Sequence, residues 1–344
     1  ILPTTGALFI MSIPVDTLLV AFDIGAKSHD FKWEFQNQSK AGQIANEVDT
    51  LRAFFEGLLK RSGSIRLLVE ATGIYYLDVV LLANELGIAV SVINPKAAHN
   101  FAKALSQRNK TDRLDAAMLL EFLKRMPFRA WQAPSRSQLE LRHYGRHLVQ
   151  LTDEKTVAHN RLHALSSTQA SPAYLKADLK RAIASLEKRI ERIRSRAMEI
   201  IRADKSILEC FKALTSIVGF AEISTISLLS ELLVLPKSLS ARACVCQAGL
   251  DPRVFESGSS VHKPPRISRH GNKYIRRALF YPAMAAGQHD PLAAAFKKRL
   301  LDKGKKKMQA IVAIMRKLLT VAWTMVKNPQ TYNAERLYSI EKMA

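Results

Sequence analysis

Four carboxylates stand where a buried strand ends or a helix begins, and such positions can gather acids over one edge of a sheet. Asp23 and Glu70 each follow an apolar run with the pattern of a strand. Asp112 and Asp115 are three residues apart at the start of a helical pattern, so both project from one helix face. Four converging acids repel one another unless cations offset their charge. Two Mg²⁺ or Mn²⁺ ions suit this set, because both ions take hard oxygen ligands and a metal pair can activate and stabilise the oxygens of a phosphodiester.

Each of these acids also has an ordinary structural role. Asp23 and Glu70 can each shape a tight turn. Asp112 can cap a helix, and Asp115 can interact with the helix dipole. For any one acid the ordinary role is the simpler explanation. Two apolar strands that both end in an acid favour the metal site formed by all four acids.

The charge balance predicts a polyanionic partner. The 344 residues include 52 Lys and Arg against 30 Asp and Glu, which gives a net charge of +22 and a pI near 10.0. Nucleic acid is the usual partner of such a chain. We find no apolar run long enough to span a bilayer and no basic amphipathic helix that would lie on one, so we expect a cytoplasmic protein without a membrane partner.

Basic side chains are the expected phosphate contacts, although a solvated surface is the ordinary alternative for any one of them. Many lie in or near the stretch 249–275, whose Gly, Pro and Ser content predicts a long surface loop. The candidates are Lys110, Arg142, Arg146, Arg161, Arg253, Lys263, Arg266, Arg269, Lys273, Arg276, Arg277, Lys305 and Lys306.

The N-terminal part has the pattern of a mixed α/β sheet with helices on its faces. An early run of strands gives way to alternating strands and helices, and we assign this domain to residues 12–130. Residues 1–11 are interpreted as a leader outside the fold, since Met11 suits a start. The expected strands are 17–25, 30–37, 42–46, 65–71 and 89–93, and the expected helices are 48–61, 75–86, 96–106 and 112–125.

The pattern changes near Pro134. Apolar residues recur at three-four spacing in two long segments, which predicts a coiled-coil helical hairpin over residues 131–206 that serves dimerisation. A helical domain is expected over residues 207–330, followed by a C-terminal tail, 331–344.

Several motifs together resemble a known family. FDIGAKSHD, VEATGIYY, INPKAAHNFAKA and KTDRLDAAML, in this order, are similar to the N-terminal half of the DEDD-type insertion-sequence transposases, which are related to the Piv site-specific invertase. The likeness continues through LRHYGRHLV, LTSIVGF, QAGLDPRVFESGSS, RISRHGNKYIRRAL and AIMRKLL. It covers about residues 17–327.

The resemblance implies a RuvC-like, RNase H-fold catalytic domain in which the four acids hold divalent metals. It also implies that Ser257 is the nucleophile of a C-terminal serine domain. A hydroxyl needs a base, a metal or a cationic field to react, and the basic side chains near Ser257 could supply that field. Relatives excise and insert DNA through a phosphoserine intermediate. They are guided by a structured bridge RNA that pairs with donor and target DNA, and their dimers pair into tetramers.

Two other functions stay open. A metal-dependent, structure-specific endonuclease similar to a Holliday-junction resolvase would need the four acids but no serine. A non-catalytic nucleic-acid-binding protein would bind tightly and show no metal-dependent chemistry.

Overall fold

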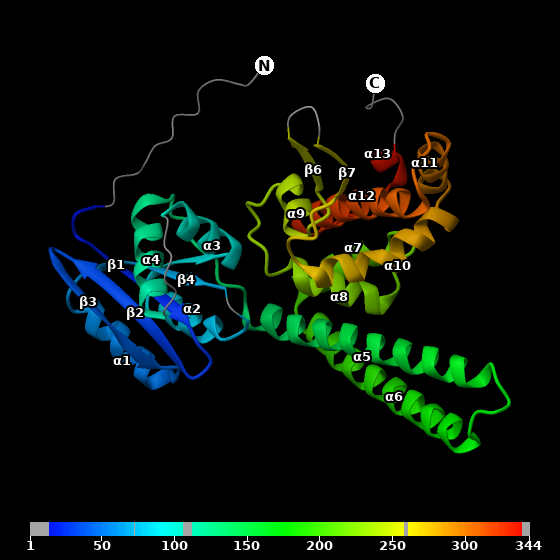
Figure 1. Ribbon diagram of the computed structural model, residues 1–344, viewed down its shortest axis with the longest axis horizontal. Coiled ribbons are helices and arrows are strands. Elements are labelled where there is room, and N and C mark those ends of the chain that lie inside the picture. The colour runs from blue at the N-terminus through cyan, green and yellow to red at the C-terminus, as the bar shows by residue number, and fades with distance from the viewer. Residues whose placement is uncertain (1–13, 72, 106–111, 258–260, 339–344) are drawn as a thin grey trace. The chain divides into compact units, whose positions relative to one another are not determined.

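The computed structural model describes residues 14–71, 73–105, 112–257 and 261–338. They fall into two compact units, within residues 1–133 and 134–344 (Figure 1).

Unit 1 is built on a five-stranded mixed sheet of order β3-β2-β1-β4-β5. β1 is antiparallel to β2 and parallel to β4, β2 and β3 are antiparallel, and β4 and β5 are parallel. The expected mixed α/β sheet is therefore confirmed. Its strands are β1 (Thr17–Ile24), β2 (Ser28–Phe35), β3 (Gln38–Ala45), β4 (Ser64–Glu70) and β5 (Ala89–Ile93), and its helices are α1 (Val48–Leu59), α2 (Tyr76–Glu85), α3 (Pro95–Ala104) and α4 (Asp112–Arg125).

Two hydrophobic cores cover the two faces of this sheet, because successive side chains of a strand point to opposite faces. Leu18, Val20 and Phe22 of β1 belong to the core shared with α1 and α2. Leu19 and Ala21 belong to the core shared with α3 and α4. β1 reads as a continuous apolar run because it is buried on both faces.

Unit 2 begins with a helical hairpin and continues as a bundle of helices with one small two-stranded sheet (Figure 1). Its strands are β6 (Pro252–Ser257) and β7 (Val261–Ile267). Its helices are α5 (Arg136–Ser166), α6 (Ala173–Ala203), α7 (Lys205–Thr215), α8 (Glu222–Leu232), α9 (Ala241–Gln247), α10 (Lys273–His289), α11 (Pro291–Asp302), α12 (Lys307–Lys327) and α13 (Ala334–Tyr338).

The two hairpin helices pack along one another and share a core with the helices that follow. Leu148 of α5 and Ala197 of α6 have no exposed surface and belong to the same cluster as Leu318 of α12. Lys155 interrupts the apolar spacing of α5 and pairs with Glu187 of α6, with 3.5 Å between Nζ and Oε1. Ser135 and Gln138 form a reciprocal cap that starts α5.

Two strands form where the sequence predicted a long loop, so that prediction was wrong. β6 and β7 pair antiparallel from Pro252 opposite Ile267 to Ser257 opposite Val261, with an irregularity between Arg253 and Phe255. Pairing between two strands is not a local property, and the prolines within this stretch concealed its strand pattern.

α12 also departs from our expectation that no segment could span a bilayer. Its 21 residues are long and apolar enough to do so by length and composition, yet half of its most apolar stretch is buried inside the structure. Trp323 and Leu318 are almost fully buried in the core of unit 2. α12 is therefore apolar because it is the central helix of that core.

Candidate functional site

Asp23 and Glu70 lie at one level on neighbouring parallel strands. β1 and β4 pair in a constant register that ends with Phe22 beside Val69, and Asp23 and Glu70 are the next residue of each strand. Asp23 lies two residues after Ala21, and Glu70 lies two residues after Leu68, so both acids belong to the sheet face that α3 and α4 cover. The register brings these two predicted acids to the same sheet edge.

α4 presents its first turn to this same edge. Lys124, near the end of α4, pairs with Glu34 of β2. Glu34 lies opposite Leu19, near the start of β1. α4 therefore runs antiparallel to β1, and its N-terminal end lies toward the carboxyl end of that strand.

Asp115 and Asp112 stand one and two helical turns before Leu119, which is fully buried between α4 and the sheet. Asp115 thus continues the sheet-facing side of the helix, and the backbone of Asp112 lies about one turn before it. Asp115 is half-buried, whereas the side chain of Asp112 lies outside the described part of the chain. The backbone therefore places Asp23 and Glu70 at one level of the sheet and directs the first turn of α4 toward that edge.

The oxygen donors of this edge fit a divalent ion by their chemistry, because Mg²⁺ and Mn²⁺ prefer carboxylates. Among the side chains that the structure describes, no three His, Cys, Asp or Glu groups form a ready metal cluster. Asp23, Glu70 and Asp115 all take part in interactions within the structure.

Asp30 is a fifth acid at this edge, and our sequence reasoning missed it. It lies directly opposite Asp23 in the β1–β2 pair and is 8% exposed. Gln43 Nε2 donates a hydrogen bond to Asp30 Oδ2 at 3.2 Å. The short separation of the two acids in FDIGAKSHD was the available signal, because a tight turn between two strands sets such residues opposite one another.

Ser257 is the last residue of β6 and lies opposite Val261 in the backbone register. Its side chain, like that of Lys263, lies outside the described part of the chain, as does all of Lys110. Pro252, at the other end of β6, is roughly 16 Å away along the strand.

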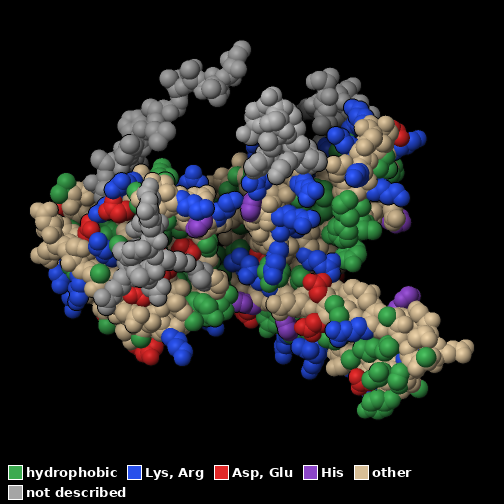
Figure 2. Space-filling view, in the orientation of Figure 1, with side chains coloured by type: hydrophobic (Ala, Val, Ile, Leu, Met, Phe, Trp, Pro, Cys, Tyr) green, Lys and Arg blue, Asp and Glu red, His purple; other side chains and the backbone are tan. Residues whose placement is uncertain are grey.

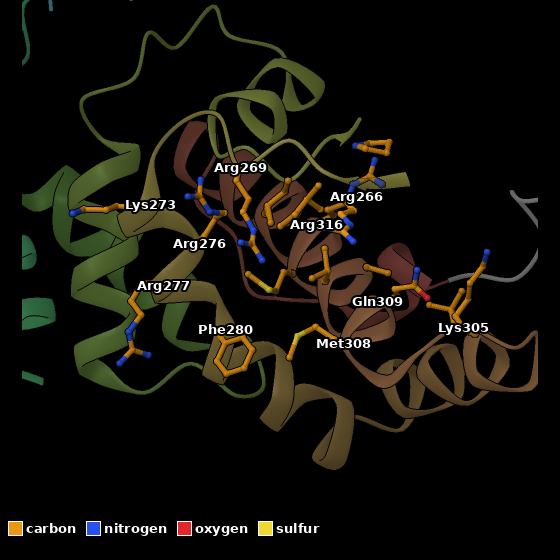
Figure 3. Close-up of a pocket in the computed structure, with 17 residues that line it drawn as sticks. Arg266, Arg269, Lys273, Arg276, Arg277, Phe280, Lys305, Met308, Gln309 and Arg316 are labelled. Carbon is orange, nitrogen blue, oxygen red and sulfur yellow. The ribbon is translucent and has the colours of Figure 1, made fainter. Parts of the chain in front are cut away.

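A cavity of about 960 Å³ opens at the Pro252 end of the β6–β7 ribbon (Figure 3). We call it the basic cavity. No Asp or Glu is among the residues that line it in the described structure. Its cationic lining consists of Arg266, Arg269, Lys273, Arg276, Arg277, Lys305 and Arg316. Figure 2 shows Lys and Arg side chains gathered over this part of unit 2.

The basic cavity brings together six of the predicted phosphate contacts, and Arg316 is the member that sequence reasoning missed. Gln309, Val312 and Ala313 of α12 line the cavity with it. These four residues have the spacing of one helix face. That spacing was the signal that could have identified Arg316.

Arg276 and Arg277 are the half-buried cations of this cavity, and the other five are exposed. Burial lowers the pKa of the Arg276 guanidinium, and the positive charge of Arg269 lowers it further. Arg276 Nη1 donates a hydrogen bond to the carbonyl oxygen of Ala248 at 2.8 Å, which fixes its position. Burial also acts against charge on Arg277, but hydrogen bonding and attraction to Asp153 outweigh it and raise the pKa. A bound anion would relieve the repulsion between Arg269 and Arg276.

Arg142 and Arg146 lie elsewhere, around Glu231, which has no exposed surface. Arg142 Nε lies 3.2 Å from Glu231 Oε2, Arg146 Nε lies 2.5 Å from Oε1, and Asn272 Nδ2 donates to Oε2 at 2.5 Å. Burial alone would raise the pKa of Glu231, but the two arginines and Asn272 outweigh it and lower the pKa. This internal network explains the positions of both arginines without any contact to a nucleic acid.

The remaining candidates stand apart from these groups. Arg161 is exposed on α5, and Lys306 is exposed immediately before α12. Arg253 lies opposite Arg266 in the β6–β7 ribbon. Their contacts with nucleic acid stay predictions.

Acids at a sheet edge in one unit and a cationic cavity in the other are the features expected of an enzyme that acts on nucleic-acid strands. Two family models match the chain. One is described as a transposase model of the DEDD type of IS110 and matches residues 20–167. The other is described as "Transposase IS116/IS110/IS902 family" and matches residues 211–298.

The chain is 31% identical over 278 residues to a pilin gene-inverting protein of Moraxella bovis, which covers 79% of this chain and 83% of the relative. The corresponding protein of Moraxella lacunata matches equally well. The chain therefore belongs to the IS116/IS110/IS902 family of transposases, and its activity is that of a DNA transposase or recombinase.

Two further likenesses are more distant. An uncharacterised insertion-element protein of Streptomyces coelicolor is 30% identical over 97 residues, which is 28% of this chain and 24% of that protein. A solved structure of Thermus thermophilus RuvC with a Holliday-junction substrate is 12% identical, covers 31% of this chain and 93% of that chain, and gives a TM-score of 0.24.

Proposed function

We propose that this transposase cuts and rejoins DNA with divalent ions held by Asp23, Glu70, Asp112 and Asp115 in a RuvC-like domain, and with Ser257 as the nucleophile. The observation that carries the metal site is the register of β1 and β4, which brings Asp23 and Glu70 to one level of one sheet face. The direction of α4 supports the other two ligands, because its first turn lies toward the same edge.

When bound, two Mg²⁺ or Mn²⁺ ions would offset the repulsion of the carboxylates and supply Lewis acidity at a scissile phosphate. Asp23 and Glu70, on rigid parallel strands, would fix the position of that charge, and the two acids of α4 would close the set. The sheet supplies the preorganisation that such a site needs, since β1 and β4, which carry Asp23 and Glu70, are buried on both faces.

The proposed covalent step is a transesterification. Ser257 Oγ loses its proton to a nearby base or water and forms a bond to phosphorus, while the bond from phosphorus to a sugar oxygen breaks and that oxygen takes up a proton. The reverse reaction, with a sugar hydroxyl from another strand, releases the serine and rejoins the DNA. No net hydrolysis occurs, so the bond energy is kept for rejoining.

The proposed partners are donor and target DNA and a structured guide RNA. The net charge of +22 and the basic cavity support a polyanionic partner. We also propose that α5 and α6 act as a coiled coil in homodimers that pair into tetramers, and that the enzyme works in the cytoplasm.

A covalent-adduct assay tests the proposed chemistry. Protein, its flanking noncoding RNA and end-labelled donor DNA are mixed with Mg²⁺, denatured and separated on a gel. We expect a labelled protein–DNA adduct that is lost in Ser257→Ala and in Asp23→Asn. Ser238→Ala and Asp178→Asn, at exposed positions of unit 2, are matched controls that should retain it.

The other outcomes separate the alternatives. Cleaved DNA without an adduct, unchanged in Ser257→Ala, would replace the serine mechanism with a metal-dependent nuclease of the resolvase type. DNA binding with neither cleavage nor adduct, at any divalent ion tested, would favour a non-catalytic binding protein.

A further inference from the structure

The basic cavity has an apolar wall as well as a cationic one. In Figure 3, Arg266, Arg269 and Arg316 lie on one side of the cavity, and Phe280 and Met308 lie on the other. Met308 is 54% exposed, although it is a large apolar side chain. The apolar lining consists of Leu250, Pro252, Ile267, Phe280, Leu300, Met308, Val312, Ala313 and Met315.

A paired duplex could contact the cationic wall of the cavity but not the apolar wall. Its outer surface offers phosphates and sugars, which the cationic wall can bind, while its bases are stacked inside. A phosphate makes no favourable contact with an apolar recess, so a bound duplex would leave the apolar wall of the cavity unused. An unpaired nucleotide matches both walls, because it carries a phosphate and a flat base that gains from burial against apolar and aromatic side chains.

The size of the cavity agrees with such an occupant. About 960 Å³ falls at the upper end of the range of pockets that enclose a small organic molecule. One nucleotide fits this volume, whereas a double helix does not. The cavity also contrasts with a flat basic patch, which would suffice for phosphates alone.

Arg276 and the start of α10 are already held in place at this cavity. Arg276 is fixed by the carbonyl oxygen of Ala248. Asn272 caps α10 by accepting hydrogen bonds from the backbone of Tyr274 and Ile275, and this sets the start of the helix that carries Lys273, Arg276 and Phe280. A site that is held in advance loses little conformational entropy on binding.

We propose that the basic cavity holds one unpaired nucleotide of a DNA or RNA strand. Its phosphate lies against the cations, led by Arg269 and Arg276, and its base lies against Phe280 and Met308. This inference rests on the proposed function in one respect, namely that nucleic acid is the partner. It adds that unit 2 takes hold of a strand where that strand is not base-paired.

Binding to a matched set of oligonucleotides tests the proposal. Fluorescence anisotropy is measured with the full-length protein in EDTA, so that cleavage does not interfere. The probes are a single-stranded DNA, its fully paired duplex, the same duplex with one unpaired nucleotide, and the single-stranded RNA of the same sequence. We expect the unpaired probes to bind at least tenfold more tightly than the paired duplex.

Two variants locate this preference in the cavity. Ala313→Phe fills the recess from α12, and Met308→Gln makes its exposed apolar wall polar without removing a cation. Both should lower affinity for the unpaired probes, by roughly tenfold and threefold, and leave affinity for the duplex unchanged. Ala295→Phe, at an exposed position of α11 that does not line the cavity, is the matched control and should change neither.

Each outcome is decisive. Equal affinity for paired and unpaired probes, unchanged in Ala313→Phe and Met308→Gln, would overturn the nucleotide pocket and leave the proposed function intact. Failure to bind any probe would overturn both. If Ala313→Phe and Met308→Gln weaken binding of only the RNA probe, or of only the unpaired DNA probes, the result would support the pocket and identify which strand occupies it.

Discussion

His29 is a histidine of β2 with no exposed surface, and its aromatic ring lies 6.0 Å from that of Phe22. Burial lowers its pKa below the ordinary value of 6.5, and the opposing influence of Asn46 and Asp78 is smaller. The imidazole is therefore uncharged in the folded protein at neutral pH. Protonation would place a charge in an aromatic core.

Acid should consequently weaken unit 1 before its carboxylates titrate. Below about pH 6.5 the unfolded chain binds a proton at His29 that the folded chain does not, so the free energy of unfolding decreases as the pH falls from 6.5 to the folded pKa. Urea unfolding at pH 7.5 and pH 5.5 should show this loss in the wild type and a smaller loss in His29→Leu. His163→Gln, at an exposed position, should behave as wild type. An identical loss in His29→Leu would assign the effect to other groups.

At the scale of single residues, the sequence predicted the positions of Asp23 and Glu70 near strand ends, and their role as metal ligands stays a prediction. Asp23 and Glu70 could be found because each ends an apolar run, which is a local signal. Asp30 and Arg316 were missed because their importance depends on what lies opposite them, a strand partner in one case and a cavity in the other. Arg142 and Arg146 look like surface cations in the sequence, since nothing near them in the chain reveals the buried Glu231.

The Glu231 network joins three elements of unit 2. Arg142 and Arg146 come from α5, Glu231 from α8, and Asn272 from the cap of α10. Removing one partner leaves buried charge without compensation, which costs about 3–5 kcal/mol in such networks.

We therefore expect Glu231→Gln to lower the free energy of unfolding by about 3 kcal/mol. Arg146→Gln should lower it by a smaller amount, because Arg142 and Asn272 still satisfy the carboxylate. Denaturant unfolding and DNA affinity should be measured on the same samples. If Arg146→Gln weakened DNA binding and left stability unchanged, the guanidinium would act on nucleic acid, as the sequence predicted. Arg181→Gln, which removes the exposed ion pair between Arg181 and Asp178 on α6, is the control.

Close packing of α5 on α8 depends on a glycine. A Cβ atom at Gly145 would lie 2.2 Å from Ser230 Oγ and 2.9 Å from Ser230 Cβ. Ser230 has no exposed surface, so it has little room to move. Gly145→Ala should destabilise unit 2 by about 1–3 kcal/mol. Gly57→Ala on the exposed side of α1, where nothing lies within 4 Å, should instead stabilise unit 1 by about 0.5–1 kcal/mol. Calorimetry would contradict the packing argument if both variants shifted the temperature of unfolding in the same direction.

Elements with strong local patterns could be predicted to within a few residues. β4 and α4 begin and end close to the expected positions because period, caps and breakers are encoded in the segment itself. The β6–β7 ribbon could not, because its stability comes from pairing between two strands. α13 lies where a tail was expected, since a single short helix carries little periodic signal.

At the scale of the whole molecule, the excess of positive charge predicts that something anionic binds but not where. A net charge of +22 spread evenly would give general attraction and no specific site. The structure concentrates part of that charge in the basic cavity, where Arg266 and Arg316 face a recess without acidic lining residues among those described. A local cluster of this kind makes contacts that displace counterions, whereas an exposed lysine on α6 need not.

Salt dependence distinguishes local contacts from general attraction. The logarithm of the binding constant for single-stranded DNA should fall linearly with the logarithm of salt concentration, and each phosphate contact contributes about 0.7 to the slope. Arg316→Gln and Lys305→Gln should each reduce the slope by about that amount. Lys188→Gln, at an exposed position on α6, changes the net charge equally and should leave the slope unchanged. Equal reductions in all three variants would mean that total charge, rather than the cavity, governs binding.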